Sequence, residues 1–431
     1  MIKKKFIVLM SVAIAACLTF SACSTGKNSS KSKENDTSKV TLDYWVCWSP
    51  GSDTEKNSKA MFAKYESEHP NVKIKYSLIT YDMAHDKLVT AASAKNTPDM
   101  SWALPEWIGE FNNMGMLSDL TDYYNKSELK SAIYPNVMDT MTVKDKVIGL
   151  PYQLTIRALL VHKSLTDAAG INNIPATFED MLKLGDIYKK TEKYPFGFCA
   201  TSVRTPQELI GYLASNGLEI ATEMKDGKYK NTWKDDPAQL AKAAEVFQYY
   251  KDLTKKGIVS PNTKAWGWED EDTNFATGQY MMEVTGNWMS ERETTNPKEM
   301  SDVAITAPPY KEIPATYMET NPTFIYTSTE HPKEAFDFAA FISGKEYQQA
   351  VFPVTSPRTD VVSDVKWSKD FMNIAKTGIS FPPVTLGGIT TAMTDSLGKT
   401  LQNNEEPSTV AAWLSDEINE SLKQSGEYSE K

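Results

Sequence analysis

The sequence predicts an α/β protein in which helices cover a mostly parallel sheet. Three apolar, alternating segments within residues 40–104 are separated by two segments with helical periodicity. This β-α-β-α-β order is typical of a parallel sheet whose crossovers are helices. The 431 residues are too many for one ordinary domain of ~100–200 residues, so we expect at least two packed units.

The first strand and helix have clear boundaries. Residues 40–47 alternate and become apolar on both faces, which predicts a strand buried on two sides. Ser52 and Glu55 have the spacing of a capping box. The helix that they open ends before Pro70, because proline cannot continue a helix.

The remaining elements follow from alternation in strands, from caps and prolines at helix starts, and from glycines at helix ends. Strands are expected over 72–78, 99–104, 281–285, 303–305 and 324–326. Helices are expected over 83–95, from Thr177, from Thr205 to Gly217, from Asp236 to Gly257, from Pro332 to Gly344 and from Ser408 onward. We find neither an internal repeat nor a heptad pattern.

Composition excludes several classes of protein. Hydrophobic residues make up 41% and charged residues 24%, which excludes a disordered chain and a multi-span membrane protein. The net charge is −10, and no domain is strongly basic, so nucleic acid is not an expected partner. The chain is otherwise polar but contains 10 Trp, 20 Tyr and 16 Phe. We therefore expect some of these rings to have a role besides packing in the core.

The N-terminus has the form of a secretory signal peptide. Lysines at 3–5 precede an apolar run over 6–20, which is shorter than the ~20 residues of a spanning helix. Polar residues between Cys23 and Val40 then predict a flexible tether. Small residues, a cysteine and a polar tether resemble a bacterial lipoprotein signal. That resemblance implies cleavage before Cys23, lipidation of Cys23 with chains such as palmitate, and anchoring to the outer face of the cytoplasmic membrane.

Alternatives remain open in this region. Cys17 is a rival cleavage site, and simple secretion would leave Cys23 unmodified. Removal of residues 1–22 leaves 43 basic and 56 acidic residues, a net charge of −13. Cys47 and Cys199 then remain in the folded part, where they either pair or stay as buried thiols.

The motifs of common enzymes and metal sites are missing. The four histidines have no ligand spacing, and the sequence contains no C-x-x-C, G-x-S-x-G or G-x-G-x-x-G. Residues 397–400 and 270–274 match only fragments of a P-loop and a calcium loop. We therefore expect no metal and no cofactor. A carbohydrate-active enzyme stays an open alternative, with paired carboxylates drawn from Glu106, Glu269, Asp270 and Glu319.

Five groups of residues carry a resemblance to a known family. They are Pro98-Asp99 with 115–117, then 149–165, 175–180, 275–288 and 356–358. In this order and spacing they resemble the extracellular solute-binding proteins of ABC importers, family 1, which includes the maltose-binding proteins. The likeness extends over residues 40–425.

The resemblance implies a two-lobed clamp like that of periplasmic binding proteins, with three crossings between lobes. The crossings are expected near 151–154, 304–309 and 353–360. Lobe 1 is then 39–151 with 309–353, and lobe 2 is 154–304 with 360–431, after a signal peptide at 1–22 and a tether at 23–38. The ligand is expected between the lobes, which close by a hinge motion and then engage the importer's permease subunits. The receptor is expected to be a monomer.

Most candidate ligand-binding residues are aromatic or polar side chains near strand and helix ends, and Gln153 and Arg157 stand at the expected crossover between the lobes. Sugars present flat apolar faces, which suit rings, and hydroxyls, which suit carboxylates and amides. The candidates are Trp48, Trp102, Glu106, Trp107, Gln153, Arg157, Trp266, Trp268, Asp270 and Trp288. Rim candidates are Glu319, Thr320 and Asn321. Structural alternatives stay open: Trp102 as core, Glu106 as a helix-dipole partner and Arg157 as an ion-pair residue.

The expected function is that of a lipid-anchored carbohydrate receptor, not an enzyme. We expect it to capture an oligosaccharide and deliver it to an ABC importer. Its location is extracellular in a Gram-positive bacterium and periplasmic otherwise. Arg157 is the only basic candidate, which disfavours anionic ligands. The alternatives are a same-fold receptor for another solute and an anchored carbohydrate-active enzyme.

Overall fold

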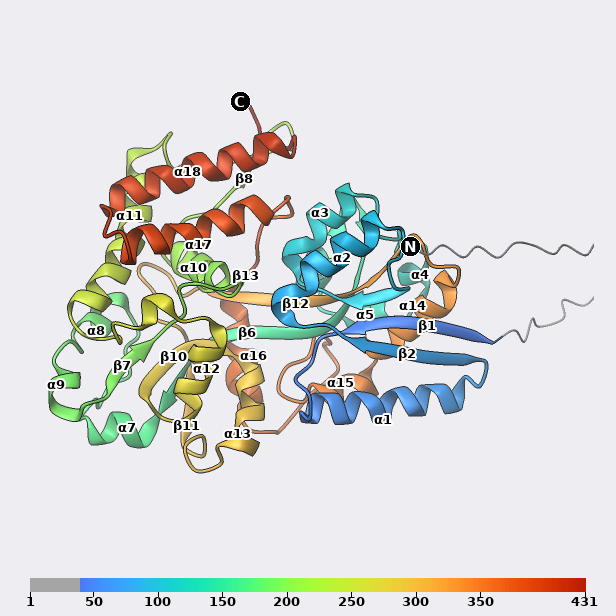
Figure 1. Ribbon diagram of the computed structural model, residues 1–431, viewed down its shortest axis with the longest axis horizontal. Helices are drawn as coiled ribbons and strands as arrows, with labels where there is room; N and C mark the ends of the chain where they lie inside the picture. Colours follow the sequence, from blue (N-terminus) through green and yellow to red (C-terminus); the bar gives the residue numbers. More distant parts are fainter. Residues whose placement is uncertain (1–38) are drawn as a thin grey trace, which may run out of the picture. The chain divides into compact units, whose positions relative to one another are not determined.

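A computed structural model describes residues 39–431, and Figure 1 labels most of its helices and strands. The expected signal peptide, the tether and Cys23 lie outside the described residues. Within residues 39–431, none of the helices combines the length and the apolar character needed to cross a membrane.

Lobe 1 is built on three parallel strands. They are β1 (Val40–Val46), β2 (Val72–Leu78) and β3 (Met100–Trp102), with β1 between the other two. Helices α1 (Asp53–Glu68) and α2 (Ala84–Ser93) connect them. The helix α1 starts as expected, because Ser52 Oγ accepts a hydrogen bond from the Glu55 amide over 3.1 Å. The predicted β-α-β-α-β order and its parallel pairing are confirmed.

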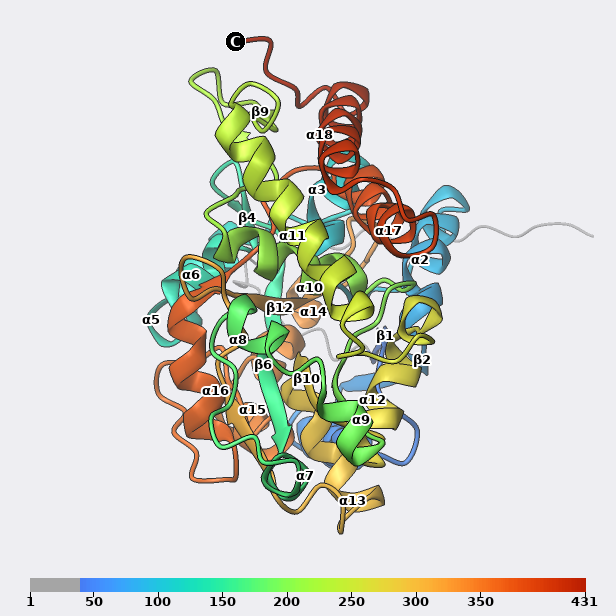
Figure 2. The same ribbon diagram turned by 90° about the vertical axis from the view of Figure 1, so that its left-hand side faces the viewer.

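Lobe 2 is a second helix-covered sheet. Its strands are β7 (Tyr194–Gly197), β10 (Tyr280–Gly286) and β11 (Val303–Thr306), and β7 pairs parallel to β10. The main helices are α10 (Thr205–Ser215), α11 (Pro237–Lys255), α17 (Gly387–Leu401) and α18 (Pro407–Gln424). Figure 2 shows α11 and α18 beside each other on this lobe.

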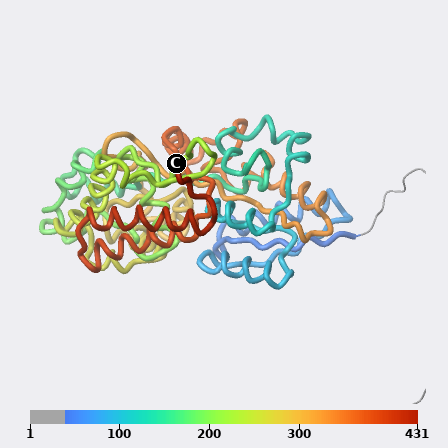
Figure 3. The backbone as a smooth tube through the Cα atoms, turned by 90° about the horizontal axis from the view of Figure 1, so that it is seen from above, coloured from blue at the N-terminus to red at the C-terminus, as the bar shows by residue number. Residues whose placement is uncertain are grey.

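Two long strands join the lobes. The strands β6 (Leu150–His162) and β12 (Thr316–Ile325) run antiparallel, and all but one of their residues are buried. The first part of β6 pairs with β12, and its last part lies between β10 and β11. The resulting sheet order is β2-β1-β3-β12-β6-β10-β7. Figure 3 shows the blue and teal residues with the early orange ones on one side, and the green, yellow and red residues on the other.

The strand β12 is longer than the sequence predicts. The sequence predicts a strand only over 324–326, and Glu319, Asn321 and Pro322 are residue types that are unfavourable inside a strand. The structure accommodates the proline at a register shift between Asn321 and Pro322. Glu319 accepts hydrogen bonds from Asn321 and from Arg157 of β6. The contact with β6 leaves no local pattern in the sequence.

The remaining elements are short or peripheral. In the first half they are η1 (Tyr81–Met83), η2 (Pro105–Trp107), α3 (Ile108–Asn113), α4 (Thr121–Lys126), α5 (Leu129–Ala132), α6 (Pro135–Asp139), β4 (Thr142–Val143), β5 (Lys146–Val147), α7 (Lys163–Ala168), α8 (Phe178–Leu182) and α9 (Ile187–Thr191). In the second half they are β8 (Thr222–Glu223), β9 (Tyr229–Lys230), η3 (Thr263–Ala265), α12 (Trp268–Ala276), η4 (Asn287–Glu291), α13 (Arg292–Thr295), α14 (Pro332–Ile342), α15 (Lys345–Val351), α16 (Ser368–Ile374), η5 (Ala375–Thr377) and β13 (Gly378–Ile379). Cys47, half-buried, and Cys199, buried, are both free thiols.

Candidate functional site

One face of the β6–β12 ladder carries polar side chains where the two lobes meet. Directly opposed residues share a face, and every second residue returns to it. Asn321 lies opposite Gln153, and Glu319 lies opposite Thr155. Arg157 Nη2 donates to Glu319 Oε2 over 2.9 Å, and Asn321 Nδ2 donates to the other Glu319 oxygen over 2.6 Å. The ladder therefore holds a buried, paired guanidinium and carboxylate at the junction.

Glu106 connects lobe 1 to lobe 2. It lies in η2, directly after β3, and its Oε1 accepts hydrogen bonds from Gln207 Nε2 over 2.7 Å and from Tyr317 OH over 3.0 Å. Its Oε2 is buried and has no hydrogen-bond partner among residues 39–431. Burial and, after it, the charge of Glu319 raise the pKa of Glu106 to about 7. One oxygen thus holds α10 of lobe 2, and the other can accept a further donor.

A row of aromatic rings also crosses the junction. Trp107 meets Trp102 edge-on, and Trp102 lies against Tyr81, each with ring centroids 5.9 Å apart. Tyr81 of lobe 1 then meets Trp268 of lobe 2 at 5.9 Å, and Trp268 Nε1 donates to Asp82 Oδ1 over 3.2 Å. Aromatic rings from both lobes are therefore neighbours at the junction.

Two guanidinium groups lie against the Trp288 ring. The Arg157 guanidinium is 4.5 Å from its centroid, and that of Arg204 is 4.7 Å away. Trp288 Nε1 donates to Asp272 Oδ2 over 3.0 Å, and Arg204 donates to both oxygens of Asp272, over 2.5 Å and 3.0 Å. Cation–π contacts and a bidentate ion pair therefore hold the side chains of Trp288, Arg204 and Asp272 in place.

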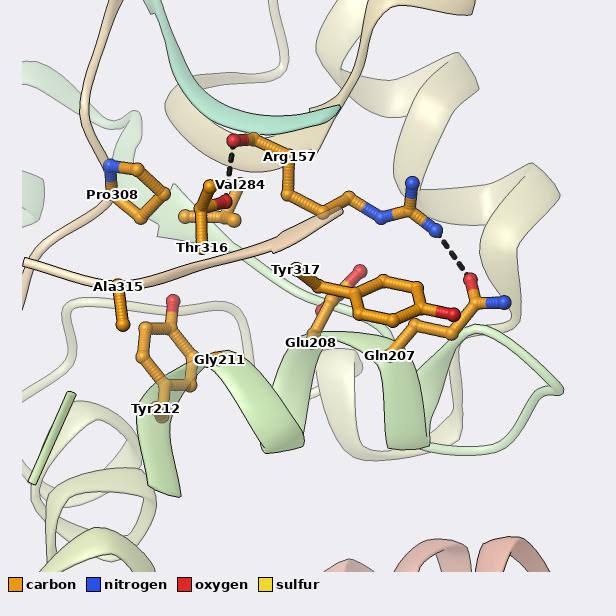
Figure 4. A pocket seen from close by; sticks show the side chains of 10 residues that line it. All are labelled: Arg157, Gln207, Glu208, Gly211, Tyr212, Val284, Pro308, Ala315, Thr316 and Tyr317. Atoms are coloured by element: carbon orange, nitrogen blue, oxygen red, sulfur yellow. Dashed lines mark hydrogen bonds between the residues drawn. The ribbon is translucent and has the colours of Figure 1, made fainter. Parts of the chain in front are cut away.

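A small cavity lies behind these residues, between α10 and the start of β12. Figure 4 shows the Arg157 guanidinium pointing toward the Gln207 amide, to which it donates, above the Tyr317 ring. The Arg157 carbonyl accepts from Thr316 Oγ1 over 2.6 Å. The cavity measures about 10 Å³, which is room for about one water molecule. It is too small for a sugar.

The structure brings many of the predicted ligand-binding residues together at the junction, and the other three make different contacts. Those that meet at the junction are Trp102, Glu106, Trp107, Gln153, Arg157, Trp268 and Trp288. Trp48 is buried against Phe62 and Tyr76 of lobe 1. Trp266 stacks on Tyr280 at 5.8 Å, and exposed Asp270 accepts from the Gly267 amide over 3.1 Å.

Several junction residues were not predicted from the sequence. They are Tyr81, Asp82, Arg204, Gln207, Asp272 and Tyr317. Gln207 stands in the first turn of a helix that the sequence marks only as a helix start. Alternation along 317–321 was the one local signal, since Tyr317, Glu319 and Asn321 are every second residue of β12.

Three buried groups in lobe 2 have donor atoms close enough to share a cation. Each group offers one ligand atom, and these atoms, from Cys199, Glu208 and Glu271, all lie within 4.8 Å of one another. Burial raises the pKa of all three groups, that of Glu271 to about 7, and so favours the protonated forms, which bind metals poorly. The Arg204 guanidinium lies 3.2 Å from Glu271 Oε2 and adds positive charge. This cluster is better suited to structural hydrogen bonding than to a metal.

Comparisons with known proteins agree with this architecture. A putative binding protein of Brucella abortus (strain 2308) is 26% identical over 289 residues, covering 66% of this chain and 67% of its own. The diacetylchitobiose binding protein DasA of Streptomyces coelicolor is 24% identical over 272 residues. The match covers 63% of this chain and 59% of DasA.

Solved structures share the fold. An ABC transporter solute binding protein from Thermotoga lettingae, bound with α-D-tagatose, has a TM-score of 0.78 at 22% identity, covering 89% of this chain and 100% of its own. The GacH receptor of Streptomyces glaucescens, solved unliganded and with acarbose, has a TM-score of 0.78 at 18% identity. The match covers 91% of this chain and 100% of the GacH chain. The two-lobed clamp expected from the sequence is confirmed at the level of fold.

The family is established by a sequence profile of bacterial extracellular solute-binding proteins, which matches residues 60–373, well over half of the chain. Members of that family bind solutes, and the expected resemblance is confirmed. This chain belongs to the bacterial extracellular solute-binding proteins.

Proposed function

We propose that this chain is a lipid-anchored receptor that captures a carbohydrate, specifically an oligosaccharide, between its lobes and delivers it to an ABC importer. The observation that carries the proposal is the environment of Glu106. Its buried carboxylate keeps one oxygen without a partner, and aromatic rings from both lobes lie nearby. A carboxylate accepts sugar hydroxyls, and rings pack against the CH faces of the sugar.

The comparisons support a sugar ligand. Within the family, DasA is named for diacetylchitobiose, and the two similar structures were solved with tagatose and acarbose. The junction also contains more acidic than basic side chains. Glu106, Glu319, Asp82 and Asp272 stand with Arg157 and Arg204, which supports a ligand without negative charge.

Closure is proposed to be a hinge motion about β6, β12 and the segment near 353–360. The hydrogen bonds from Gln207 to Glu106 and from Trp268 to Asp82 support this, because both join the lobes and must open before a sugar can enter between them. The sugar then replaces direct contacts such as Gln207–Glu106 and favours the closed form only by what it gains from the second lobe. No bond is broken, so we propose no enzymatic activity.

We retain the expected lobe bounds as a proposal, with one refinement. Tyr310 donates its amide to Ala176 of lobe 2, and Tyr317 packs in the lobe 2 core, whereas Phe324 packs in the lobe 1 core. These contacts favour a second crossing inside β12 rather than at 304–309. The third crossing fits beside β6, where Thr355 Oγ1 donates to the Leu154 carbonyl over 2.5 Å.

The anchor and the partners complete the proposal. Lipid on Cys23 would hold a monomeric receptor at the outer face of the cytoplasmic membrane, near the permease subunits. The lipoprotein-like residues before Cys23 support the anchor, and the extracellular character of the family supports the location. Metabolic labelling with a palmitate analogue should tag the chain, and Cys23→Ala should remove the label.

A ligand screen tests the proposal. The purified chain without residues 1–22 is heated with maltose, mannotriose, diacetylchitobiose, acarbose and a set of amino acids and peptides, and each hit is titrated by calorimetry. We expect a sugar to raise the melting temperature with no release of new reducing ends. A response only to non-sugar solutes would favour a different receptor. Sustained hydrolysis that is abolished by Glu106→Gln would favour an enzyme.

A further inference from the structure

A second contact between the lobes lies away from the polar junction, at Gly109. This residue is buried in α3 of lobe 1 and faces the main chain just before α17 of lobe 2. Figure 1 shows α3 and α17 above the joining strands. A Cβ atom at residue 109 would lie 2.5 Å from the Val384 oxygen, 2.7 Å from its carbonyl carbon and 3.0 Å from the Thr385 nitrogen.

These distances leave no space for a side chain. The opposing atoms belong to the backbone, so they cannot rotate away as a flexible side chain would. The Thr385 amide is itself held by Glu427 Oε2 over 2.9 Å, and Val384 is buried in the lobe 2 core. Any residue larger than glycine at 109 would therefore force α3 and the main chain at Val384 and Thr385 to move apart.

The backbone at residue 109 does not require glycine. Its φ is outside the left-handed region, and helical glycine is less stable than alanine because the unfolded chain gains more freedom. A glycine that weakens its own helix without a conformational need indicates a packing role. The neighbouring contact is favourable: Asn113 Nδ2 donates to Thr385 Oγ1 over 3.1 Å.

We infer that Gly109 lets lobe 1 close onto the main chain of Val384 and Thr385, and that this contact sets how far the clamp closes on its ligand. The contact contains none of the residues proposed to bind the sugar. It acts on affinity through the closed state alone, because ligand contacts from the second lobe form only when closure is complete. The inference rests on the proposed hinge function.

The test compares Gly109→Ala with Gly398→Ala. Gly398 lies inside α17, and a Cβ there would meet nothing within 4 Å, so this control adds the same methyl group without a clash. Each full chain without residues 1–22 is measured by small-angle scattering and calorimetry with maltose, mannotriose and diacetylchitobiose. Thermal unfolding without sugar checks the fold of each variant.

We expect the unaltered chain and Gly398→Ala to compact with the sugar that binds. Gly109→Ala should unfold at nearly the same temperature without sugar, bind about tenfold more weakly or worse, and compact less. Equal compaction and affinity in Gly109→Ala would overturn the inference. A steep fall in its melting temperature without sugar would also overturn it, because α3 would then be packed on Val384 in both states.

A cross-linking experiment needs no ligand. Asn113→Cys with Thr385→Cys places two thiols where a hydrogen bond joins the lobes, so oxidation reports how often the free clamp closes. Adding Gly109→Ala should slow cross-linking several-fold, and Gly398→Ala should not; equal rates refute the inference. If no sugar compacts the unaltered chain, the proposed function fails, and the cross-linking rates still decide the role of Gly109.

Discussion

Glu106 Oε1 in lobe 1 accepts a hydrogen bond from Gln207 Nε2 in lobe 2 over 2.7 Å, and both side chains are buried. The same oxygen accepts from Tyr317 OH over 3.0 Å. A single carboxylate is thus held by donors on α10 and β12. The arrangement fixes the orientation of Glu106 and leaves its second oxygen as a buried acceptor.

At pH 8, where Glu106 is mostly ionised, Glu106→Gln should weaken sugar binding by about tenfold to a hundredfold, because a hydrogen bond to a charged acceptor contributes about 1.5–3 kcal/mol. The free protein should not lose stability, since the change also removes repulsion from Glu319. Isothermal calorimetry measures the affinity. Glu346→Gln, an exposed carboxylate paired with Lys64, is the control and should leave affinity unchanged. Equal affinities for both variants would remove Glu106 from the binding site.

Stability should fall as pH rises from about 4.5 to about 7. Burial, with smaller effects from neighbouring charges, raises the pKa values of Glu106 and Glu271 to about 7, from an ordinary 4.5. In this window the native state binds more protons than the unfolded state, so the free energy of unfolding decreases with pH and levels off above about 7. Each group contributes up to about 3 kcal/mol.

Urea unfolding at pH 5, 6, 7 and 8 measures this slope. Glu106→Gln and Glu271→Gln should each flatten it, because glutamine does not titrate. A free energy of unfolding that increases between pH 5 and pH 7 would contradict the raised pKa values.

Trp48→Ala should destabilise the fold by about 3–5 kcal/mol, because it removes a buried ring from contacts with Phe62 and Tyr76 and leaves a cavity. Sugar affinity, measured below the unfolding temperature, should stay nearly unchanged. Denaturant unfolding and calorimetry separate the two effects. A stable variant with lost affinity would show that Trp48 belongs with the ligand.

Trp268→Ala should have the opposite effect. The ring is half-buried and contacts lobe 1 at Tyr81 and Asp82, so its loss should cost little stability in the free protein. Affinity should fall about tenfold, since stacking rings contribute about 1 kcal/mol beyond their buried area. Tyr188→Ala, which removes an exposed ring stacked on Tyr194, is the control for general loss of an aromatic side chain. Unchanged affinity in Trp268→Ala would refute its contact with sugar.

Arg204→Met should destabilise the protein by about 3–5 kcal/mol, because Asp272 would remain buried without its bidentate partner. Adding Asp272→Asn should restore part of that loss, since the uncompensated charge is removed. Thermal and urea unfolding measure both variants. If the double variant were as unstable as the sum of the two single ones, the pair would not be coupled.

Some of the fold was predictable because its signals are local. Residues 72–78 alternate strictly, and the strand β2 has these bounds. The Ser52–Glu55 spacing and the Asp236-Pro237 start depend only on near neighbours, and both open helices as expected. The strand β12 escaped prediction because its polar side chains are stabilised by β6, more than 150 residues away.

The sequence by itself determined the α/β class, the family likeness and the candidate residue types, with Trp102 and Glu106 near a strand end and Arg157 at the crossover. The class follows from periodicity and helix caps, and the family likeness follows from several motifs in their order and spacing. Only the tertiary structure decided which side chains meet. It joined Glu106 to Gln207, Trp268 to Asp82, and Gly109 to Val384, and it placed Trp48 in a core. Contacts across a junction depend on how two lobes pack, and that packing is set by long strand pairings which have no local pattern.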